Sequence, residues 1–395
     1  MTYSQSSTSP VSFSVPGESV PSLLPSRVER DSLIVLNAIS GFGNRRTIKL
    51  IEHYGSAQGV LERLGGDISL FTDVPEAAVF NFKNFDKEEF MAREMAHLKE
   101  HDARIVTFLD KDYPPALRNI HDYPLVLYVC GDWPENMDCS VAVVGSRKPT
   151  FYGLETAEKF SRALAELGVV VVSGLARGID AAAHRGCLKA NGQTIAVLGC
   201  GLDYIYPEEN RELYELIKTQ GCLMSEFPFG TKPITYNFPR RNRIVSGVSL
   251  GVLVVEANIK SGALITAGFA LEQGKEVFAV PGRIDSTLSS GPLALIKQGA
   301  KVALSVEDLL EELPLRLRGN SVLSQQPELF PMDKEAGLSA EEKRVLHIIK
   351  EGKLLTLEEI ELKTGLAPSS LMGPLLLLEI KRLIRQQPGK VYEVA

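Results

Sequence analysis

Five short apolar runs between residues 141 and 282 constrain the fold more than any other feature of this chain. Each run is rich in β-branched residues, ends in a small or polar residue, and precedes a segment with helical patterning. The runs begin at Val141, Val169, Thr194, Leu250 and Glu276. Apolar strands that alternate with helices are typical of a parallel sheet buried on both faces. The sequence therefore predicts an α/β fold with a Rossmann-like, doubly wound and mostly parallel sheet.

The rest of the chain predicts smaller units around this sheet. A length of 395 residues allows about two or three domains. Residues 1–29 are rich in serine and proline and are expected to form a disordered tail. Residues 30–110 have helical patterning, 111–313 hold the sheet, and 314–337 have the mixed, proline-punctuated composition of a linker. Residues 338–395 show three helical segments and a final hairpin, which predict a small winged-helix-like domain.

The sequence does not assign a role to the helical N-terminal domain or to the winged-helix-like C-terminal domain. Residues 33–51 predict two helices joined by a short glycine turn, which resembles a helix-hairpin-helix unit, although a pair of helices that only packs fits equally well. In the predicted winged helix, the third helix runs from about Ser370 to Arg382 and carries almost no cations before its end. A protein contact or simple packing therefore suits that helix better than duplex DNA.

Composition and cysteine usage indicate a cytoplasmic protein without a membrane partner. No apolar run approaches the roughly 20 residues that span a bilayer, and the N-terminus lacks the features of a secretory signal. The 5 cysteines are scattered and never spaced as Cys-x-x-Cys, which argues against disulfides and structural zinc. The net charge of −6 excludes a protein that is basic all over, but it allows a local basic groove.

Several short motifs approach enzyme or metal signatures and then depart from them. Gly199-Cys-Gly201 opens a dinucleotide pattern, but Tyr204 replaces the third glycine, and residues 268–276 match a Walker A loop only with the wrong spacing. His97 to His101 fits a zinc-peptidase pattern, yet it lies on a charged helix, where a solvated face is expected. His184 has no nucleophile paired with it and is expected to be a packed or helix-surface residue. We therefore predict no cofactor, no metal and no catalytic residue.

Glycine-rich turns follow three of the predicted strands. Gly145-Ser146-Arg147, the segment from Ser173 to Asp180, and the segment from Ser261 to Thr266 combine backbone N–H groups with nearby cations. Ligands of such sheets bind at the carboxyl ends of the strands, and helix N-termini there favour anions. One such turn would be explained by a tight chain reversal alone. Three turns in one sheet, with Arg147 and Arg177, predict phosphate binding.

The segment from Phe227 to Arg243 mixes aromatic residues with arginines in a long connection between two strands. Stacking faces beside cations suit single-stranded nucleic acid. Alternatively, one or two of the arginines brace acidic neighbours such as Glu226 and Glu256. The residues expected to bind phosphate or DNA are Gly145, Ser146, Arg147, Ser173, Gly174, Arg177, Gly178, Arg240, Arg241, Asn242, Arg243, Lys260, Ser261, Gly262, Thr266 and Lys297, with Phe238 and Tyr236 expected to stack on bases.

Together these motifs resemble the DprA/Smf (DNA processing) family. The resemblance rests on Gly145 to Arg147, Ser173 to Asp180, Tyr206-Pro207 with Asn210, Ser225-Glu226, Phe238 to Arg243, Glu256-Ala257, Ser261 to Ala267 and Val280-Pro281-Gly282. It implies a Rossmann-like core that binds and protects single-stranded DNA, forms a homodimer, and loads RecA onto the strand during natural transformation. A helical N-terminal domain, of the SAM or helix-hairpin-helix type, and a winged-helix tail accompany the core in many members.

The chain departs from the family pattern at two places, and two other functions are alternatives to the one that the resemblance implies. Pro292 follows Gly291 where asparagine is common, and Glu208-Glu209 stand where a basic residue often contributes to the groove. One rival is a Rossmann enzyme of the nucleoside-monophosphate phosphoribohydrolase type, but the carboxylate-bearing stretch of that group is replaced here by residues 256–267. The other rival is a pure adaptor that makes protein contacts alone. The sequence favours a non-enzymatic, single-strand DNA-binding recombination mediator.

Overall fold

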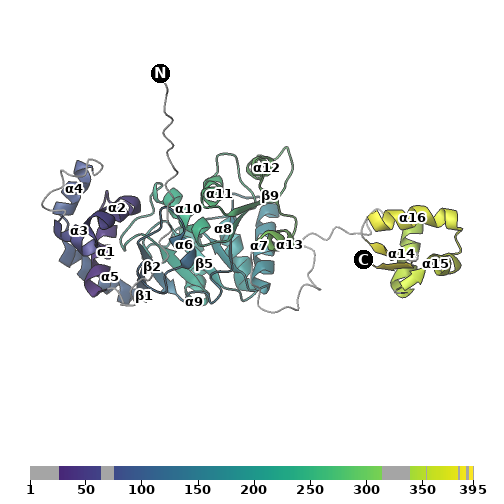
Figure 1. Ribbon diagram of the computed structural model, residues 1–395, viewed down its shortest axis with the longest axis horizontal. Helices are drawn as coiled ribbons and strands as arrows, with labels where there is room; N and C mark the ends of the chain where they lie inside the picture. The colour runs from purple at the N-terminus through teal and green to yellow at the C-terminus, as the bar shows by residue number, and fades with distance from the viewer. Residues whose placement is uncertain are drawn as a thin grey trace, which may run out of the picture.

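The computed structural model describes residues 26–63, 75–313, 339–352, 354–380, 383–387 and 391–394. An α/β core follows a helical N-terminal part, and a small domain ends the chain (Figure 1). The predicted linker lies outside the described residues, and so does most of the predicted N-terminal tail. No helix within the described ranges combines the length and the hydropathy that crossing a membrane requires.

A nine-stranded sheet forms the core, in the order β1-β2-β6-β5-β4-β3-β7-β8-β9. All neighbours from β6 to β9 in that order pair in parallel, while β1 and β2 add an antiparallel edge. The doubly wound, mostly parallel sheet predicted from the sequence is therefore confirmed. The strands are β1 (Ala103–Thr107), β2 (Val126–Gly131), β3 (Ser140–Val144), β4 (Val170–Ser173), β5 (Thr194–Leu198), β6 (Cys222–Ser225), β7 (Gly251–Val254), β8 (Glu276–Ala279) and β9 (Lys301–Val302).

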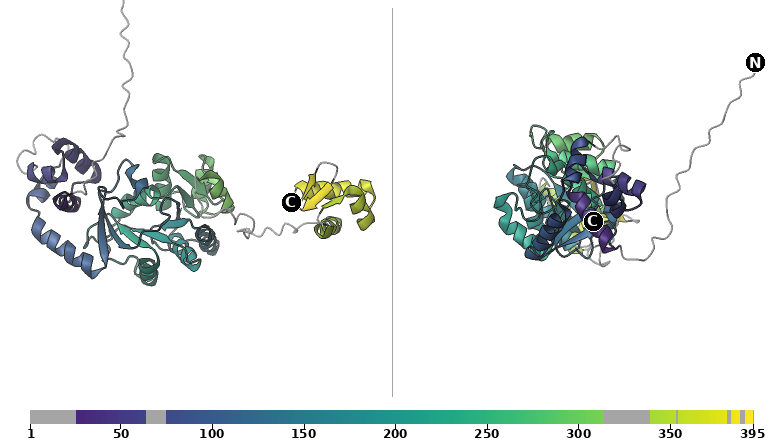
Figure 2. Two further views of the ribbon diagram at one scale, coloured as in Figure 1. Left: turned by 60° about the horizontal axis from the view of Figure 1, so that its bottom comes forward. Right: turned by 90° about the vertical axis from the view of Figure 1, so that its left-hand side faces the viewer.

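Helices cover both faces of this sheet, which is why its strands are apolar without alternation (Figure 2). In β3, Ala142 and Val144 belong to the core under α10 and α11, whereas Val141 and Val143 belong to the core under α7 and α8. The helices of the core are α6 (Pro115–Arg118), α7 (Phe151–Glu166), α8 (Ile179–Lys189), α9 (Arg211–Gln220), α10 (Asn237–Gly247), α11 (Gly262–Glu272), α12 (Ser290–Lys297) and α13 (Glu307–Glu312).

The strand order reverses direction at β3. From β3 the chain adds β4, β5 and β6 on one side, and it then returns to add β7, β8 and β9 on the other side. In open α/β sheets such a reversal opens a crevice at the carboxyl ends of the two central strands. The turns after β3 and β7, which contain Arg147 and Ser261, flank this crevice.

The N-terminal part packs against the antiparallel edge of the sheet. Arg30 on α1 donates a hydrogen bond to the carbonyl oxygen of Ile105 at 2.9 Å and lies 3.2 Å from the Asp110 carboxylate. The sheet begins at Ala103, inside the range for which the sequence predicted helices. The five helices are α1 (Arg27–Ala38), α2 (Asn44–Tyr54), α3 (Ala57–Arg63), α4 (Glu76–Lys83) and α5 (Lys87–Glu100).

The charged helix expected around His97 and His101 is α5, the second of two helices between Glu76 and Glu100. Asp86 caps the second one, α5, because its side chain accepts a hydrogen bond from the backbone N–H of Glu89 at 2.9 Å. A capping aspartate has non-helical backbone angles, so it separates α5 from α4.

The C-terminal domain has the predicted winged-helix pattern and its own apolar core. Its first helix starts with a capping box, since Ser339 and Glu342 exchange backbone-to-side-chain hydrogen bonds of 2.9 and 3.2 Å. Thr356 and Glu359 form a second capping box. The elements are α14 (Ala340–Gly352), β10 (Leu354–Thr356), α15 (Leu357–Thr364), α16 (Pro368–Ile380), β11 (Ile384–Gln387) and β12 (Val391–Val394), with the sheet order β10-β12-β11.

All 5 cysteines of the chain lie in the described core, where all are buried and none forms a disulfide. Burial raises the pKa of Cys187 and of Cys200 to about 12, and it also raises the pKa values of Cys130 and Cys222. The thiolate is the reactive form of cysteine, so these groups are protected from oxidation and alkylation in the folded protein.

Candidate nucleic-acid interface

A groove of about 680 Å³ lies at the carboxyl ends of β3, β4 and β7, where the sheet reverses its winding. Its lining comes from the three glycine-rich turns and from one side of α10. Most of the residues predicted to bind phosphate or to stack on bases meet here. They are Gly145, Ser146, Arg147, Gly174, Phe238, Arg241, Asn242, Lys260, Ser261, Gly262 and Thr266.

The turn after β3 and the turn after β4 pack directly against each other. A side chain at Gly145 would place its Cβ 2.6 Å from Ile179 and 2.8 Å from the carbonyl oxygen of Glu256. Gly178 has a φ of +78°, and a Cβ there would lie 2.3 Å from the carbonyl oxygen of Ser146. Ile179 also donates its backbone N–H to that oxygen at 3.1 Å. Gly178 therefore sets the position of the Ser146 turn and does not itself line the groove.

Glu256 braces the first turn from behind. Its side chain is buried and accepts hydrogen bonds from the backbone N–H and the hydroxyl of Thr150, at 2.8 and 2.7 Å. Its backbone carbonyl accepts from Ser146 N–H at 2.6 Å. Because both carboxylate oxygens are held by Thr150, the charge of Glu256 is directed toward the start of α7 and away from the groove.

The exposed charges at the groove are cationic. Arg147 lies with its guanidinium carbon 5.1 Å from the centre of the Phe238 ring, an arrangement that leaves one face of the cation open to solvent. Lys148 and Lys260 are also exposed along the lining. Lys148 was not singled out from the sequence, although its position next to Arg147 was a usable signal.

Arg241 lies beneath the groove rather than on its surface. Its side chain is 4% exposed, and its guanidinium occupies the space in which a Cβ of Gly174 would fall. It donates a hydrogen bond to the carbonyl oxygen of Val197, and burial lowers its pKa from the ordinary value while the nearby Asp180 opposes that change. Arg241 can add positive potential to the groove, but it supports the Gly174 turn from below.

The start of α11 forms the opposite wall of the groove. Ser261 caps this helix by accepting from the backbone N–H of Ala263 at 3.3 Å. Asn242 bridges α10 to α11 by donating to the carbonyl oxygen of Gly262 at 3.2 Å, and Thr266 is buried in the first turn. The N-terminus of α11 faces the groove, and it adds the partial positive charge that favours an anion.

A smaller hollow of about 40 Å³ adjoins this groove around Arg177, Tyr206 and Phe238. The rings of Tyr206 and Phe238 lie 5.5 Å apart with an interplanar angle of 35°. Arg177 is exposed, and its guanidinium lies 2.5 Å from the carboxylate of Glu209. Glu208 pairs with Arg211 at 2.6 Å. Both glutamates that depart from the family pattern, Glu208 and Glu209, therefore have a cationic partner close by.

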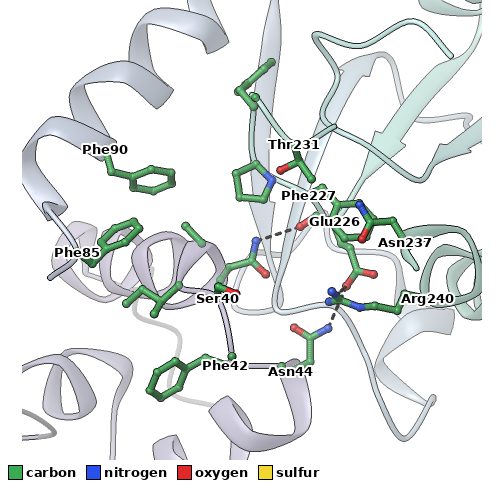
Figure 3. A pocket seen from close by; sticks show the side chains of 18 of the residues that line it. Ser40, Phe42, Asn44, Phe85, Phe90, Glu226, Phe227, Thr231, Asn237 and Arg240 are labelled. Carbon is green, nitrogen blue, oxygen red and sulfur yellow. Dashed lines mark hydrogen bonds and ion pairs between the residues drawn. The ribbon is translucent and has the colours of Figure 1, made fainter. Parts of the chain in front are cut away.

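The remaining predicted residues lie elsewhere. Arg243 is buried and bonded to Glu226 and Asp122, at 2.6 and 3.2 Å, which fits the bracing alternative. Ser173 is buried and donates to the carbonyl oxygen of Val143 at 2.7 Å. Arg240 and Tyr236 border a second hollow on the other side of α10 (Figure 3), and Lys297 is exposed at the end of α12, outside the groove lining.

The histidine motif on α5 packs against the core. The rings of His97 and His101 stack on Phe229 with centroid distances of 5.3 and 5.4 Å, and both histidines are half-buried, whereas Glu100 is exposed as expected. Candidate ligand atoms of His97, Glu100 and His101 lie within 4.8 Å of one another. His184 is fully buried beside Thr194, at 2.7 Å, and burial lowers its pKa to about 3, which makes it a packed histidine.

Comparison with known proteins agrees with this architecture. The family model of DNA recombination-mediator protein A matches residues 104–314, and the DprA winged helix domain matches residues 331–390. Protein Smf of Synechocystis sp. is 41% identical over 332 residues, which cover 75% of this chain and 82% of that protein. DNA processing protein DprA of Streptococcus pneumoniae is 40% identical over 275 residues, which cover 69% of this chain and 94% of that protein.

A solved structure is also similar over most of its length. The X-ray structure of DNA processing protein A from Streptococcus pneumoniae aligns with a TM-score of 0.61 and 37% identity, covering 72% of this chain and 98% of that one. The first family model spans nearly the whole nine-stranded sheet, including the three glycine-rich turns. This chain belongs to the DNA recombination-mediator protein A family, and its role is in DNA processing.

Proposed function

We propose that this protein binds single-stranded DNA in the groove at the strand ends and acts there as a recombination mediator. The observation that carries the proposal is the pairing of Arg147 with Phe238, whose ring centre lies 5.1 Å from the guanidinium carbon, in a groove that the exposed Lys148 and Lys260 also line. Cations that track a backbone beside aromatic faces are the combination that single-stranded nucleic acid needs. Arg147 and Lys260 would hold phosphates, the turn amides and Ser261 would add donors, and Phe238 would stack on a base.

The proposed contact set is narrower than the set expected from the sequence. Arg177 can contact the strand only when a phosphate displaces Glu209. Arg241 adds positive potential from beneath the groove. Arg243 and Ser173 are left out because their polar groups are engaged inside the fold. Lys297 is left out because it does not line the groove.

A binding assay tests this function directly. Fluorescence anisotropy of a labelled single strand and of a duplex of equal length should show tighter binding of the single strand at every salt concentration. The logarithm of the affinity should fall linearly with the logarithm of the salt concentration, because phosphate contacts release counterions. Equal affinity for the duplex, or binding that is insensitive to salt, would contradict the proposal.

The finer role follows the family resemblance. We propose that the protein forms a homodimer, protects an incoming strand, and loads RecA onto it during natural transformation. Adding the protein should shorten the lag before RecA hydrolyses ATP on a protected single strand, and sedimentation should give twice the chain mass. An unchanged lag would limit the function to strand binding.

The proposal also holds that the protein is not an enzyme. Incubation with AMP and with ATP should release neither adenine nor phosphate above a buffer control. Release of adenine from AMP at a rate that depends on protein concentration would favour the phosphoribohydrolase alternative.

A further inference from the structure

A second and larger hollow, of about 950 Å³, lies between the helical N-terminal part and the core (Figure 3). We propose that it binds a further segment of the same single strand, as a continuation of the groove. This inference rests on the proposed function. The hollow is called the interdomain cleft below, and it is bordered by the turn before α2, by the α4–α5 connection and by residues 226–240.

The interdomain cleft carries more cations than anions. Four arginines line it, two of them exposed on the N-terminal helices, against two carboxyl groups. The exposed pair is Arg45 on α2 and Arg93 on α5, and the half-buried pair is Arg46 and Arg240. The N-cap residue of α2 is Gly43, which has no side chain to cap the helix, and the first turn holds no acidic residue, so the positive end of the helix dipole is not offset there.

The two carboxyl groups of the cleft are already neutralised. Glu226 is buried and accepts hydrogen bonds from Arg243 at 2.6 Å and from Asn44 at 3.1 Å, with Arg240 at 3.7 Å. Asp122 lies 3.2 Å from the same Arg243. Arg243 and Arg240 together carry the two positive charges that offset these two carboxylates, which leaves Arg45, Arg46 and Arg93 as the surplus cations of the cleft.

Aromatic side chains supply stacking faces in the cleft. Tyr236 is 70% exposed at the start of α10, and the Arg240 guanidinium lies 6.0 Å from the centre of its ring. Phe85 is half-buried on the opposite side, and the centroid of its ring lies 5.1 Å from that of Phe90 (Figure 3). The cleft therefore repeats the chemistry of the groove, with cations beside exposed or half-exposed rings.

One short segment connects the two hollows. Pro233, Thr235, Phe238 and Arg241 line the groove, whereas Ile234, Tyr236, Asn237 and Arg240 line the interdomain cleft. Residues 233–241 are thus a ridge with the groove on one side and the cleft on the other. A strand that leaves the groove over Phe238 meets Tyr236 next, and then Arg240 and the arginines of the N-terminal helices.

The test compares two oligothymidylates, one of about 6 nucleotides that the groove alone can fill and one of about 16 nucleotides that reaches the cleft. The Arg45→Ala/Arg93→Ala double variant should lose roughly tenfold in affinity for the longer strand and keep wild-type affinity for the shorter one. Its salt slope on the longer strand should fall by about 1.4, since each single-strand phosphate contact contributes about 0.7.

The matched control is Lys49→Ala/Lys99→Ala, which removes two exposed cations from the same two helices, α2 and α5, outside the cleft lining. It should bind both strands as the wild type does. An equal loss in the control, a loss on the short strand, or unchanged binding of the longer strand by the arginine variant would overturn the inference while leaving the groove intact. If the wild type binds neither strand, the proposed function fails and this inference fails with it.

Discussion

The arginines around the groove differ sharply in exposure, and exposure decides what each one does. Arg147 is exposed beside Phe238, Arg241 is buried under Gly174, and Arg243 is buried against Glu226. A guanidinium that faces solvent can exchange water for a phosphate at little cost. A buried guanidinium must first break the internal hydrogen bonds that keep it in place. The three residues should therefore respond differently to the same substitution.

Replacing Arg147 with alanine should weaken single-strand binding without affecting the fold. The slope of log affinity against log salt should decrease by about 0.7, the share of one phosphate contact. Circular dichroism and the melting temperature should stay at wild-type values, because an exposed side chain contributes little packing. Normal binding combined with early melting would assign Arg147 to the structure and remove it from the interface.

Replacing Arg243 with alanine should act in the opposite way. Glu226, which is 3% exposed, would lose its closest partner and be left with Asn44 at 3.1 Å and the more distant Arg240 at 3.7 Å. Breaking a buried pair from one side costs about 3–5 kcal/mol of unfolding free energy. Urea denaturation should show this loss, and an Arg243→Ala protein as stable as the wild type would contradict the internal role.

The different roles of neighbouring arginines were beyond sequence reasoning. The sequence singled out the segment from Phe238 to Arg243 as a unit, but consecutive residues of a helix point about 100° apart. The residue at which α10 begins therefore decides which arginine faces solvent. The sequence does not mark that residue, because the N-cap, Tyr236, makes no side-chain capping hydrogen bond.

At the scale of elements, α5 holds a buried carboxyl group against the sheet. Glu94 is fully buried, and burial raises its pKa from 4.5 to about 7. The folded state thus favours the protonated form. The stabilisation that comes from keeping Glu94 protonated is fully present below about pH 4.5. It is lost as the pH rises through 7, because the Glu94 carboxyl group must then ionise inside the protein.

Replacing Glu94 with glutamine should remove this pH dependence. At pH 8 the variant should be more stable than the wild type by about 2–3 kcal/mol, whereas at pH 4 the two should be similar. Urea denaturation of both proteins at the two pH values measures the difference, and effects of other carboxyl groups cancel in the comparison. A gain that is equal at both pH values would show that glutamine improves packing rather than relieving a charge.

Strand prediction succeeded for most of the central parallel strands, but it missed β1, although Ile105, Val106 and Thr107 are β-branched, and two strands with weak local signals. β3, β4, β5, β7 and β8 were identified from their runs of valine and isoleucine. β6 has the sequence Cys-Leu-Met-Ser, which carries no strand signal of its own, and β9 has only 2 exposed residues. Both are strands because their neighbours in the sheet provide hydrogen-bonding partners, a long-range effect that local propensity does not contain.

At the scale of the whole molecule, the C-terminal domain has a core separate from the sheet. A protein that ends at Leu313 should therefore keep the melting temperature of the core and the affinity for the short single strand. Differential scanning calorimetry and anisotropy measure the two quantities. Loss of short-strand binding in the truncated protein would mean that the winged-helix domain contributes to the groove.

The net charge of the whole chain gives no sign of the two hollows that are lined by cations. The chain has a net charge of −6, yet the groove and the interdomain cleft are lined by exposed or half-buried arginine and lysine side chains. The fold brings residues from positions 45 to 260 to these two hollows. Composition alone could only leave room for a basic groove. The rule that ligands of α/β sheets bind at the strand ends predicted where the groove lies, but it did not predict the interdomain cleft.

The burial of every native thiol makes the protein convenient for optical measurement. A maleimide dye reacts with thiolates, so at neutral pH the folded wild-type protein should take up almost no label. A cysteine introduced at the exposed Lys49 would then carry the only dye, next to the interdomain cleft but outside its lining. Energy transfer from that dye to either end of a bound oligonucleotide would report the direction in which the strand runs across α10.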